Sequence, residues 1–75
     1  MQAMDEHLTE TVDAILRYLD SHPDAADTEE GIAKWWLPNA LSVDICTVQL
    51  ALSRLERQGL IHRRINTDQH ELFSR

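Results

Sequence analysis

Hydrophobic positions in the first third of the chain recur at the spacing of one helix face. The apolar residues at i, i+3, i+4 and i+7 are Val12, Ile15, Leu16 and Leu19. Charged residues fill the intervening positions, and Pro23 closes the segment. The pattern predicts an amphipathic helix that begins at Thr9. Residues 1–8 show no such periodicity, and we expect them to be flexible.

A second helical segment is indicated around the two tryptophans. Asp27 and Glu30 have the spacing of a capping box with Asp27 in the cap position. The apolar residues that then share one helical face are Ile32, Ala33 and Trp36. We expect a short helix from Thr28 to Leu37 that ends before Pro38.

The middle of the chain carries the most regular helical pattern. Ser42 or Asp44 can cap a third helix, and Gly59 is placed to end it. Its apolar positions are Ile45, Val48, Ala51, Leu52 and Leu55. After Gly59 the period changes from helical to alternating, with polar residues 66–69 between two short runs. The end of the chain is therefore predicted to form a hairpin of two strands.

The same periodicity predicts the buried core. The residues expected inside are Val12, Ile15, Leu16, Leu19, Ile32, Trp36, Val48, Leu52, Leu55 and Leu60. Trp35 and Trp36 point about 100° apart on a helix, so both cannot enter a small core. Trp36 belongs with Ile32 inside. Trp35 either forms an exposed contact surface or packs beneath the first helix or the following turn.

Composition limits the class of protein. At 75 residues and 8.7 kDa, with 43% hydrophobic and 27% charged residues, the chain is expected to form one globular domain. The single Cys46 excludes an intrachain disulfide and a multi-thiolate metal site, and we expect it to be partly buried. No apolar run approaches the roughly 20 residues that span a bilayer. We therefore expect a cytoplasmic protein without a membrane segment.

Charge is distributed unevenly along the chain. The net charge is −6, but residues 1–46 carry −8 and residues 47–75 carry +2. An acidic protein is an unfavourable partner for nucleic acid, whereas its basic last third is compatible with phosphate contacts. The net charge alone therefore does not decide whether the protein binds nucleic acid.

The stretch from Thr47 to Ile61 follows the pattern T-V-x-x-A-L-x-x-L-E-x-x-G-L-I. This run resembles the third helix and first wing strand of winged helix-turn-helix proteins. Residues 28–33, T-E-E-G-I-A, are similar to the start of the second helix in that family. The resemblance extends over about Thr9 to Phe73. It implies an α+β, mostly helical fold in which residues 9–75 form three helices and a C-terminal two-stranded wing.

The resemblance also implies a function. In this family the third helix enters the major groove of double-stranded DNA while the wing meets the adjacent backbone. The residues so placed here are Thr47, Gln49, Leu50, Arg54, Arg57, Arg63 and Arg64. The chain is then expected to be a small transcriptional regulator or accessory subunit.

A protein-binding winged helix is the alternative. Leu50 cannot hydrogen-bond a base edge, and Asp44 repels phosphate. In this alternative the acidic first two helices, Trp35 and Leu50 engage a protein partner. A homodimer is a further expectation, with its surface formed by Met4, Leu8, Trp35 and Leu37.

Enzymatic function is not expected. The sequence contains no glycine-rich phosphate loop and no nucleophile elbow, and its histidines lack metal-ligand spacing. We therefore predict no catalytic residue, no metal and no cofactor.

Overall fold

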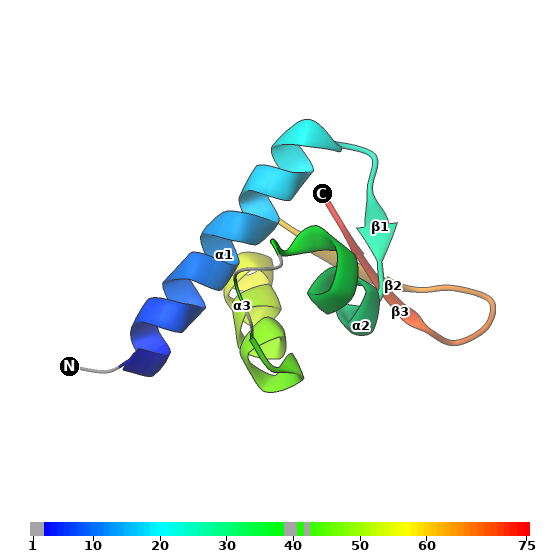
Figure 1. Ribbon diagram of the computed structural model, residues 1–75. Coiled ribbons are helices and arrows are strands. Elements are labelled where there is room, and N and C mark those ends of the chain that lie inside the picture. The colour runs from blue at the N-terminus through cyan, green and yellow to red at the C-terminus, as the bar shows by residue number, and fades with distance from the viewer. Residues whose placement is uncertain (1–2, 39–40, 42) are drawn as a thin grey trace.

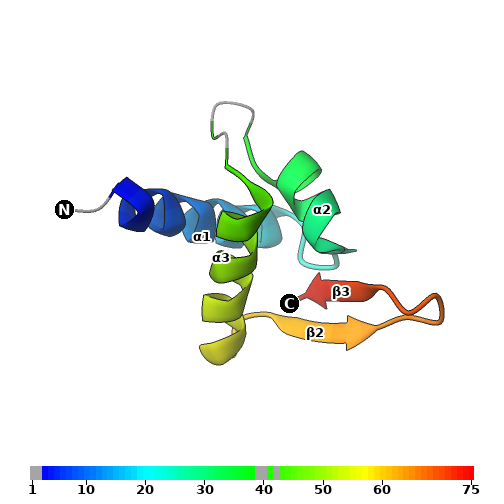
Figure 2. The same ribbon diagram turned by 90° about the horizontal axis from the view of Figure 1, so that it is seen from below.

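The computed structural model describes residues 3–38, 41 and 43–75, which form an α+β fold. The elements are α1 (Ala3–Ser21), β1 (Ala26–Asp27), α2 (Glu29–Gly31), the π-helical turn η1 (Ile32–Trp36), α3 (Ile45–Arg57), β2 (His62–Ile65) and β3 (Glu71–Ser74). Figure 1 shows α1 lying across α3, with the α2–η1 segment beside them and the strands beyond it. From below, α3 crosses α1 and leads directly into the β2–β3 hairpin (Figure 2). The third helix and the hairpin therefore adjoin one another.

The first helix is longer than the periodicity predicts. It begins at Ala3, so the predicted start at Thr9 is wrong. Leu8 stands one helical turn before Val12 and packs, half-buried, against the core. The apolar stripe of α1 therefore extends further toward the N-terminus than its most regular part suggests.

The second helix is capped one residue later than predicted. The hydroxyl of Thr28 accepts the N–H of Gly31 at 3.1 Å, so Thr28 is the N-cap. Asp27 instead accepts the N–H of Thr28 at 2.8 Å. Because Asp27 is paired with Phe73 in the sheet, it is extended and the helix starts after it. The predicted end before Pro38 is confirmed, since η1 stops at Trp36.

Both ends of α3 are fixed by local hydrogen bonds. Asp44 is the N-cap, and its carboxylate accepts the N–H of Thr47 at 2.9 Å. Ser42, the other predicted cap, lies outside the described residues. At the other end Gly59 adopts φ 75°, and Leu60 N–H donates to the Leu55 carbonyl at 2.9 Å. With the bond from Gly59 N–H to the Glu56 carbonyl at 3.1 Å, this is a Schellman motif, so the predicted stop at Gly59 is confirmed.

The predicted hairpin is confirmed, but the sheet has an additional strand. β2 and β3 pair antiparallel, with Arg63 opposite Phe73. In the connecting turn the Asn66 side chain accepts the N–H groups of Asp68 and His70 at 2.9 and 3.0 Å. β1 pairs with the other edge of β3, which gives the order β1-β3-β2 in the described residues. The sheet is therefore three-stranded, not two-stranded, because β3 is central.

The core lies between α1, η1, α3 and the sheet. Its buried hydrophobic residues are Val12, Ala14, Ile15, Leu19, Ile32, Trp36, Leu37, Val48, Ala51, Leu52, Leu55, Ile61 and Phe73. Most of the predicted core is confirmed. Leu16 is half-buried, and Leu60 is 45% exposed, so its predicted burial is wrong. The Schellman turn directs the next residue, Ile61, into the core instead.

None of the helices in the described part of the chain combines the length and the apolar character needed to cross a bilayer.

Candidate functional site: α3 and the β2–β3 hairpin

The helical period of α3 divides it into a buried face and an outward face. Val48, Leu52 and Leu55 are buried against the rest of the fold. The residues on the opposite side, which are all exposed, are Cys46, Leu50, Ser53 and Arg57. Leu50 is 50% exposed near the middle of the helix. Cys46 was predicted to be partly buried, and that prediction is wrong because its position lies opposite Val48 and Leu55.

The N-terminus of α3 is occupied by its own cap. The Thr47 backbone N–H and hydroxyl both donate to the Asp44 carboxylate, each at 2.9 Å. These two bonds hold the pKa of Asp44 below its usual range. A carboxylate therefore remains ionised at this end of the helix, and the Thr47 hydroxyl is already bonded to it.

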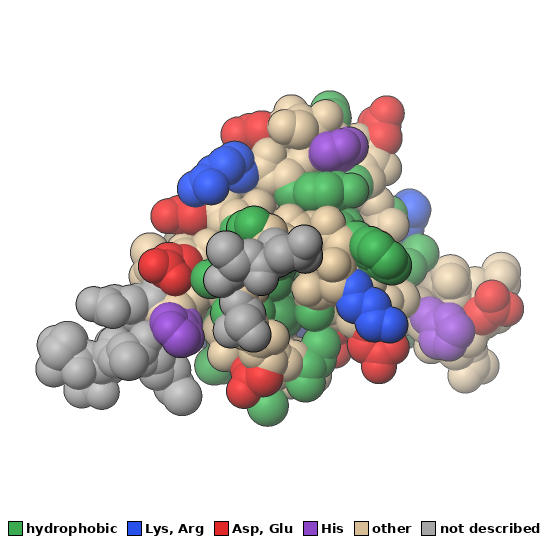
Figure 3. All heavy atoms as spheres, viewed as in Figure 1, with side chains coloured by type: hydrophobic (Ala, Val, Ile, Leu, Met, Phe, Trp, Pro, Cys, Tyr) green, Lys and Arg blue, Asp and Glu red, His purple; other side chains and the backbone are tan. Residues whose placement is uncertain are grey.

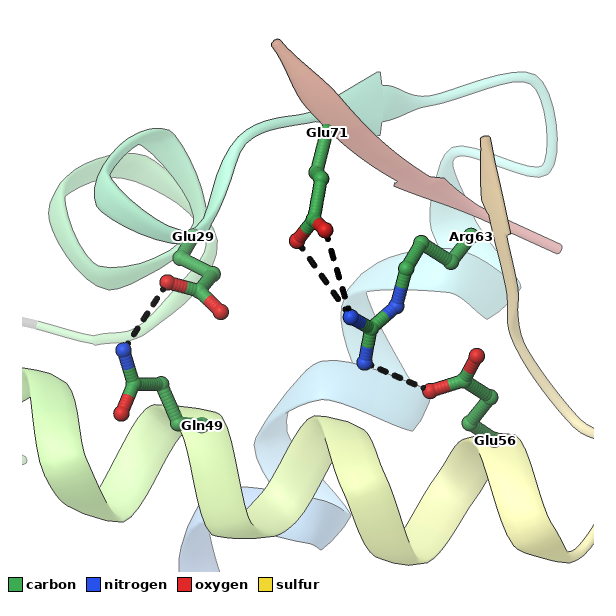
Figure 4. A network of polar contacts seen from close by, with 5 residues as sticks. All are labelled: Glu29, Gln49, Glu56, Arg63 and Glu71. Atoms are coloured by element: carbon green, nitrogen blue, oxygen red, sulfur yellow. Dashed lines mark hydrogen bonds and ion pairs between the residues drawn. The ribbon is translucent and has the colours of Figure 1, made fainter. Parts of the chain in front are cut away.

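Gln49 connects α3 to the second helix. Its side-chain amide donates to the Glu29 carboxylate at 3.1 Å, as Figure 4 shows. This contact places an acid from the N-terminal part of the chain beside the outward face of α3. Gln49 is the polar side chain of α3 best suited to contact a base edge, and it is already hydrogen-bonded to the Glu29 carboxylate.

Arg63 lies between two carboxylates. Its guanidinium donates to Glu56 of α3 at 2.8 Å and to Glu71 of β3 at 3.4 Å (Figure 4). It also lies 5.2 Å from the centroid of the Phe73 ring. The hydrogen bond to Glu56 raises the pKa of Arg63 above its usual value, and the charges of Glu56 and Glu71 add to the rise. One cation is therefore matched by two anions where α3 meets the hairpin.

The other predicted arginines differ from Arg63. Arg57 and Arg64 are exposed and Arg54 is half-buried. Within the described part of the chain, the ion pairs include none of these three. Their charges are therefore available to a ligand, whereas that of Arg63 is already compensated.

The structure thus assembles the predicted α3–hairpin surface, but with acidic residues inside it. Sequence reasoning had placed Asp44 near the helix end, whereas it missed Glu29 and Glu71. The hairpin register contains a signal for Glu71, because this residue is the diagonal cross-strand neighbour of Arg63. The contact of Glu29 depends on how α2 packs on α3 and has no local signal.

The predicted dimer residues whose side chains the structure describes, Leu8, Trp35 and Leu37, do not form one surface. Trp35 is 72% exposed, which confirms its outward orientation. Leu37 is 6% exposed, so the expectation that it is available at the surface is wrong. Leu8 packs against the core near the N-terminal end of α1. It is about 15 Å along the helix from Tyr18, the α1 residue that lies in one groove with Trp35. The side chain of Met4 lies outside the described ones. The homodimer therefore stays a prediction without an assembled contact surface.

Among the described residues, no cluster of three or more His, Cys, Asp or Glu side chains is arranged to hold a metal ion.

Comparison with protein-family models, with curated proteins and with solved structures found no match to this chain.

Proposed function

We propose that this chain is a winged-helix domain that binds a protein partner through the outward face of α3 and the adjoining hairpin. Support for the fold comes from the order of helices and hairpin together with the motif of residues 47–61. The observation that carries the choice of partner is the position of Arg63 between Glu56 and Glu71.

Electrostatics disfavours a phosphate backbone at this surface. A phosphate that approached Arg63 would compete with two carboxylates and would itself be repelled by them. Asp44 and Glu29 add negative charge at the other end of α3. The net charge of −6 acts in the same direction at longer range.

The shape and chemistry of the outward face suit a protein. Leu50 is a large apolar side chain at its centre, and its helical neighbours Cys46 and Ser53 are small enough to let a partner approach. Arg57, Asp44 and Gln49 surround it with polar groups. An apolar anchor within a polar rim is the arrangement that protein interfaces use.

Double-stranded DNA is the second candidate, and one observation favours it. Arg54, Arg57 and Arg64 take part in none of the ion pairs of the described residues. If these three contacted phosphates, the slope of log affinity on log salt would be about −2.7, and the double change Arg57→Ala/Arg64→Ala would reduce its magnitude by about 2.

The experiment compares two surface variants. Affinity enrichment from the source cells uses the wild-type chain, Leu50→Glu and the control Asp13→Ala on the exposed side of α1, and the retained protein is then purified and titrated by calorimetry. We expect Leu50→Glu to weaken binding of the purified partner at least about tenfold, because the anchor becomes charged, while Asp13→Ala, away from α3 and the hairpin, changes it little.

A fluorescence titration with random-sequence duplex DNA provides the opposing outcome. DNA binding would have to follow the predicted salt slope, be lost in Arg57→Ala/Arg64→Ala and persist in Leu50→Glu. That result would overturn the proposed protein partner in favour of DNA.

A further inference from the structure

An aromatic groove lies away from the α3–hairpin surface, between the C-terminal half of α1 and the segment from Trp35 to Pro38. Its volume is about 360 Å³. One side is formed by Arg17 and Tyr18 of α1 and by His22, which directly follows the helix, and the other side by Trp35, Trp36 and Pro38. Figure 3 shows hydrophobic side chains exposed beside a histidine on the face where α1 meets the α2–η1 segment. This groove is not used by the function proposed above.

Three rings form a stacked row in the groove. The Trp36 and Tyr18 ring centroids are 4.8 Å apart with an interplanar angle of 11°. The Tyr18 and His22 centroids are 4.2 Å apart at 18°. Because Trp36 is buried and anchors the row, the rings are held in place before any ligand binds.

Trp35 is the exposed wall of the groove. Its side chain is 72% exposed, whereas the neighbouring Trp36 is 4% exposed. Trp36 therefore fills the core, whereas Trp35 buries little surface and contributes little to the stability of the fold. Tryptophan and tyrosine carry a polar donor on an apolar ring, and both residue types are enriched where a protein holds a peptide.

We propose that this groove binds a proline-containing peptide in the polyproline II conformation that carries an acidic residue next to Arg17. The lining residues on this side run from Ala14 of α1 to His22 just after the helix, a length of about 12 Å at the helical rise. At 3.1 Å per residue this length matches about four residues of polyproline II, enough for two prolines three positions apart.

Hydrogen bonding favours the same occupant. A polyproline II backbone has no internal hydrogen bonds, so its carbonyls can accept from the Tyr18 hydroxyl and the Trp35 indole N–H. The carbonyls of a helix are already used by the helix itself. Proline rings also pack on aromatic side chains without losing side-chain rotamer freedom.

The positive charge of Arg17 determines where the bound peptide carries its acidic residue. Among the described residues that line the groove, Arg17 carries the permanent positive charge and none is Asp or Glu. A carboxylate in the peptide therefore finds a partner, whereas a lysine or arginine at that point is repelled. A second copy of this chain cannot supply the peptide, because its two prolines, Pro23 and Pro38, are far apart in sequence.

The test is a ¹H–¹⁵N NMR titration with acetyl-Asp-(Pro)₆-amide, acetyl-(Pro)₆-amide and a Gly-Ser peptide of equal length. The chain has two tryptophans, so the indole region reports Trp35 and Trp36 separately. We expect both proline probes to shift the Trp35 indole signal and the backbone signals of Arg17, Tyr18 and His22. The Asp-containing probe should bind about three- to tenfold more tightly than the uncharged one.

Matched variants separate the groove from the rest of the surface. Trp35→Ala should weaken both proline probes at least about tenfold while the rest of the spectrum is preserved, since Trp35 is exposed. Arg17→Ala should remove the advantage of the Asp-containing probe and leave (Pro)₆ binding unchanged. Leu50→Ala on α3 should alter neither, so a failure here is distinct from a failure of the α3 proposal.

Three outcomes would overturn the proposal. The first is the absence of shifts at millimolar concentrations of either proline probe. The second is that the Gly-Ser peptide binds as tightly as the proline probes, or that the Trp35→Ala variant binds the proline probes as tightly as wild type does. The third is a concentration-dependent shift of the Trp35 signal without any peptide, which would assign the groove to a second copy of the chain.

Discussion

Leu60 and Ile61 offer a direct test of how the chain leaves α3. They are adjacent isomers of nearly equal volume, yet Leu60 is 45% exposed and Ile61 is fully buried. The Schellman bonds of Gly59 and Leu60 impose this difference, because they fix the direction of the chain after the helix. Truncating each residue to alanine should therefore have very different costs.

The magnitudes follow from burial. Removing a fully buried isoleucine side chain costs about 2–5 kcal/mol. Complete burial of a leucine is worth about 1.5–3 kcal/mol, so truncating the half-exposed Leu60 should cost about 1 kcal/mol. For a domain of this size, each kcal/mol lowers Tm by about 4–8 °C. We expect Ile61→Ala to lower Tm by more than about 10 °C and Leu60→Ala by about half of that or less.

Urea unfolding measures both costs in the same assay. Fluorescence of the buried Trp36 reports loss of the core, and an unchanged m-value shows that the midpoint shift reflects stability alone. If Leu60→Ala costs as much free energy as Ile61→Ala, then the direction of the chain after Gly59 differs from that described here.

Three further changes test local features of the fold. Gly59→Ala should cost about 1–2 kcal/mol from backbone strain alone, because φ is +75° and no atom lies within 4 Å of an added Cβ; an unshifted urea midpoint would contradict this. Phe73→Ala should cost about 3–5 kcal/mol, out of a total of about 4–11 kcal/mol for a chain of this length, and circular dichroism at increasing temperature would detect it. The lowered pKa of Asp44 means that its ionised form stabilises the fold above the unfolded-state pKa, and that this contribution is lost as pH falls through the folded-state pKa. Wild type should therefore lose its stability advantage over Asp44→Asn progressively as pH falls from neutral through the ordinary Asp value of about 3.9 and then through the lower folded-state pKa, and a constant difference in urea midpoint would refute the assignment.

The third helix could be predicted from the sequence because all its determinants are local. The cap at Asp44, the apolar stripe and the stop at Gly59 act within one continuous segment. β1 could not be predicted in this way. It has two residues, too few for an alternating pattern, and it exists because β3 from the other end of the chain pairs with it.

In the candidate site too, local features could be predicted from the sequence, whereas contacts between distant elements could not. Leu50 and Arg57, which the resemblance implies to be on the exposed side, do lie on the outward face of α3, since the buried stripe determines the opposite face. Whether an arginine on that surface is available depends on contacts between elements. Arg63 and Arg64 are adjacent in sequence and of the same type, yet only Arg63 points toward the acids of α3 and β3.

Charge segregation along the chain is not preserved in the folded molecule. Arg75, in the basic last third, donates to the Leu19 carbonyl at 3.2 Å and to the Asp20 carboxylate of α1 at 3.4 Å. Glu29, in the acidic part, reaches Gln49 of α3 at 3.1 Å. Each exposed pair contributes little to stability, but each changes the local charge that a ligand meets. A basic segment forms a basic surface only where folding keeps acids away from it, and around α3 this fold brings them in.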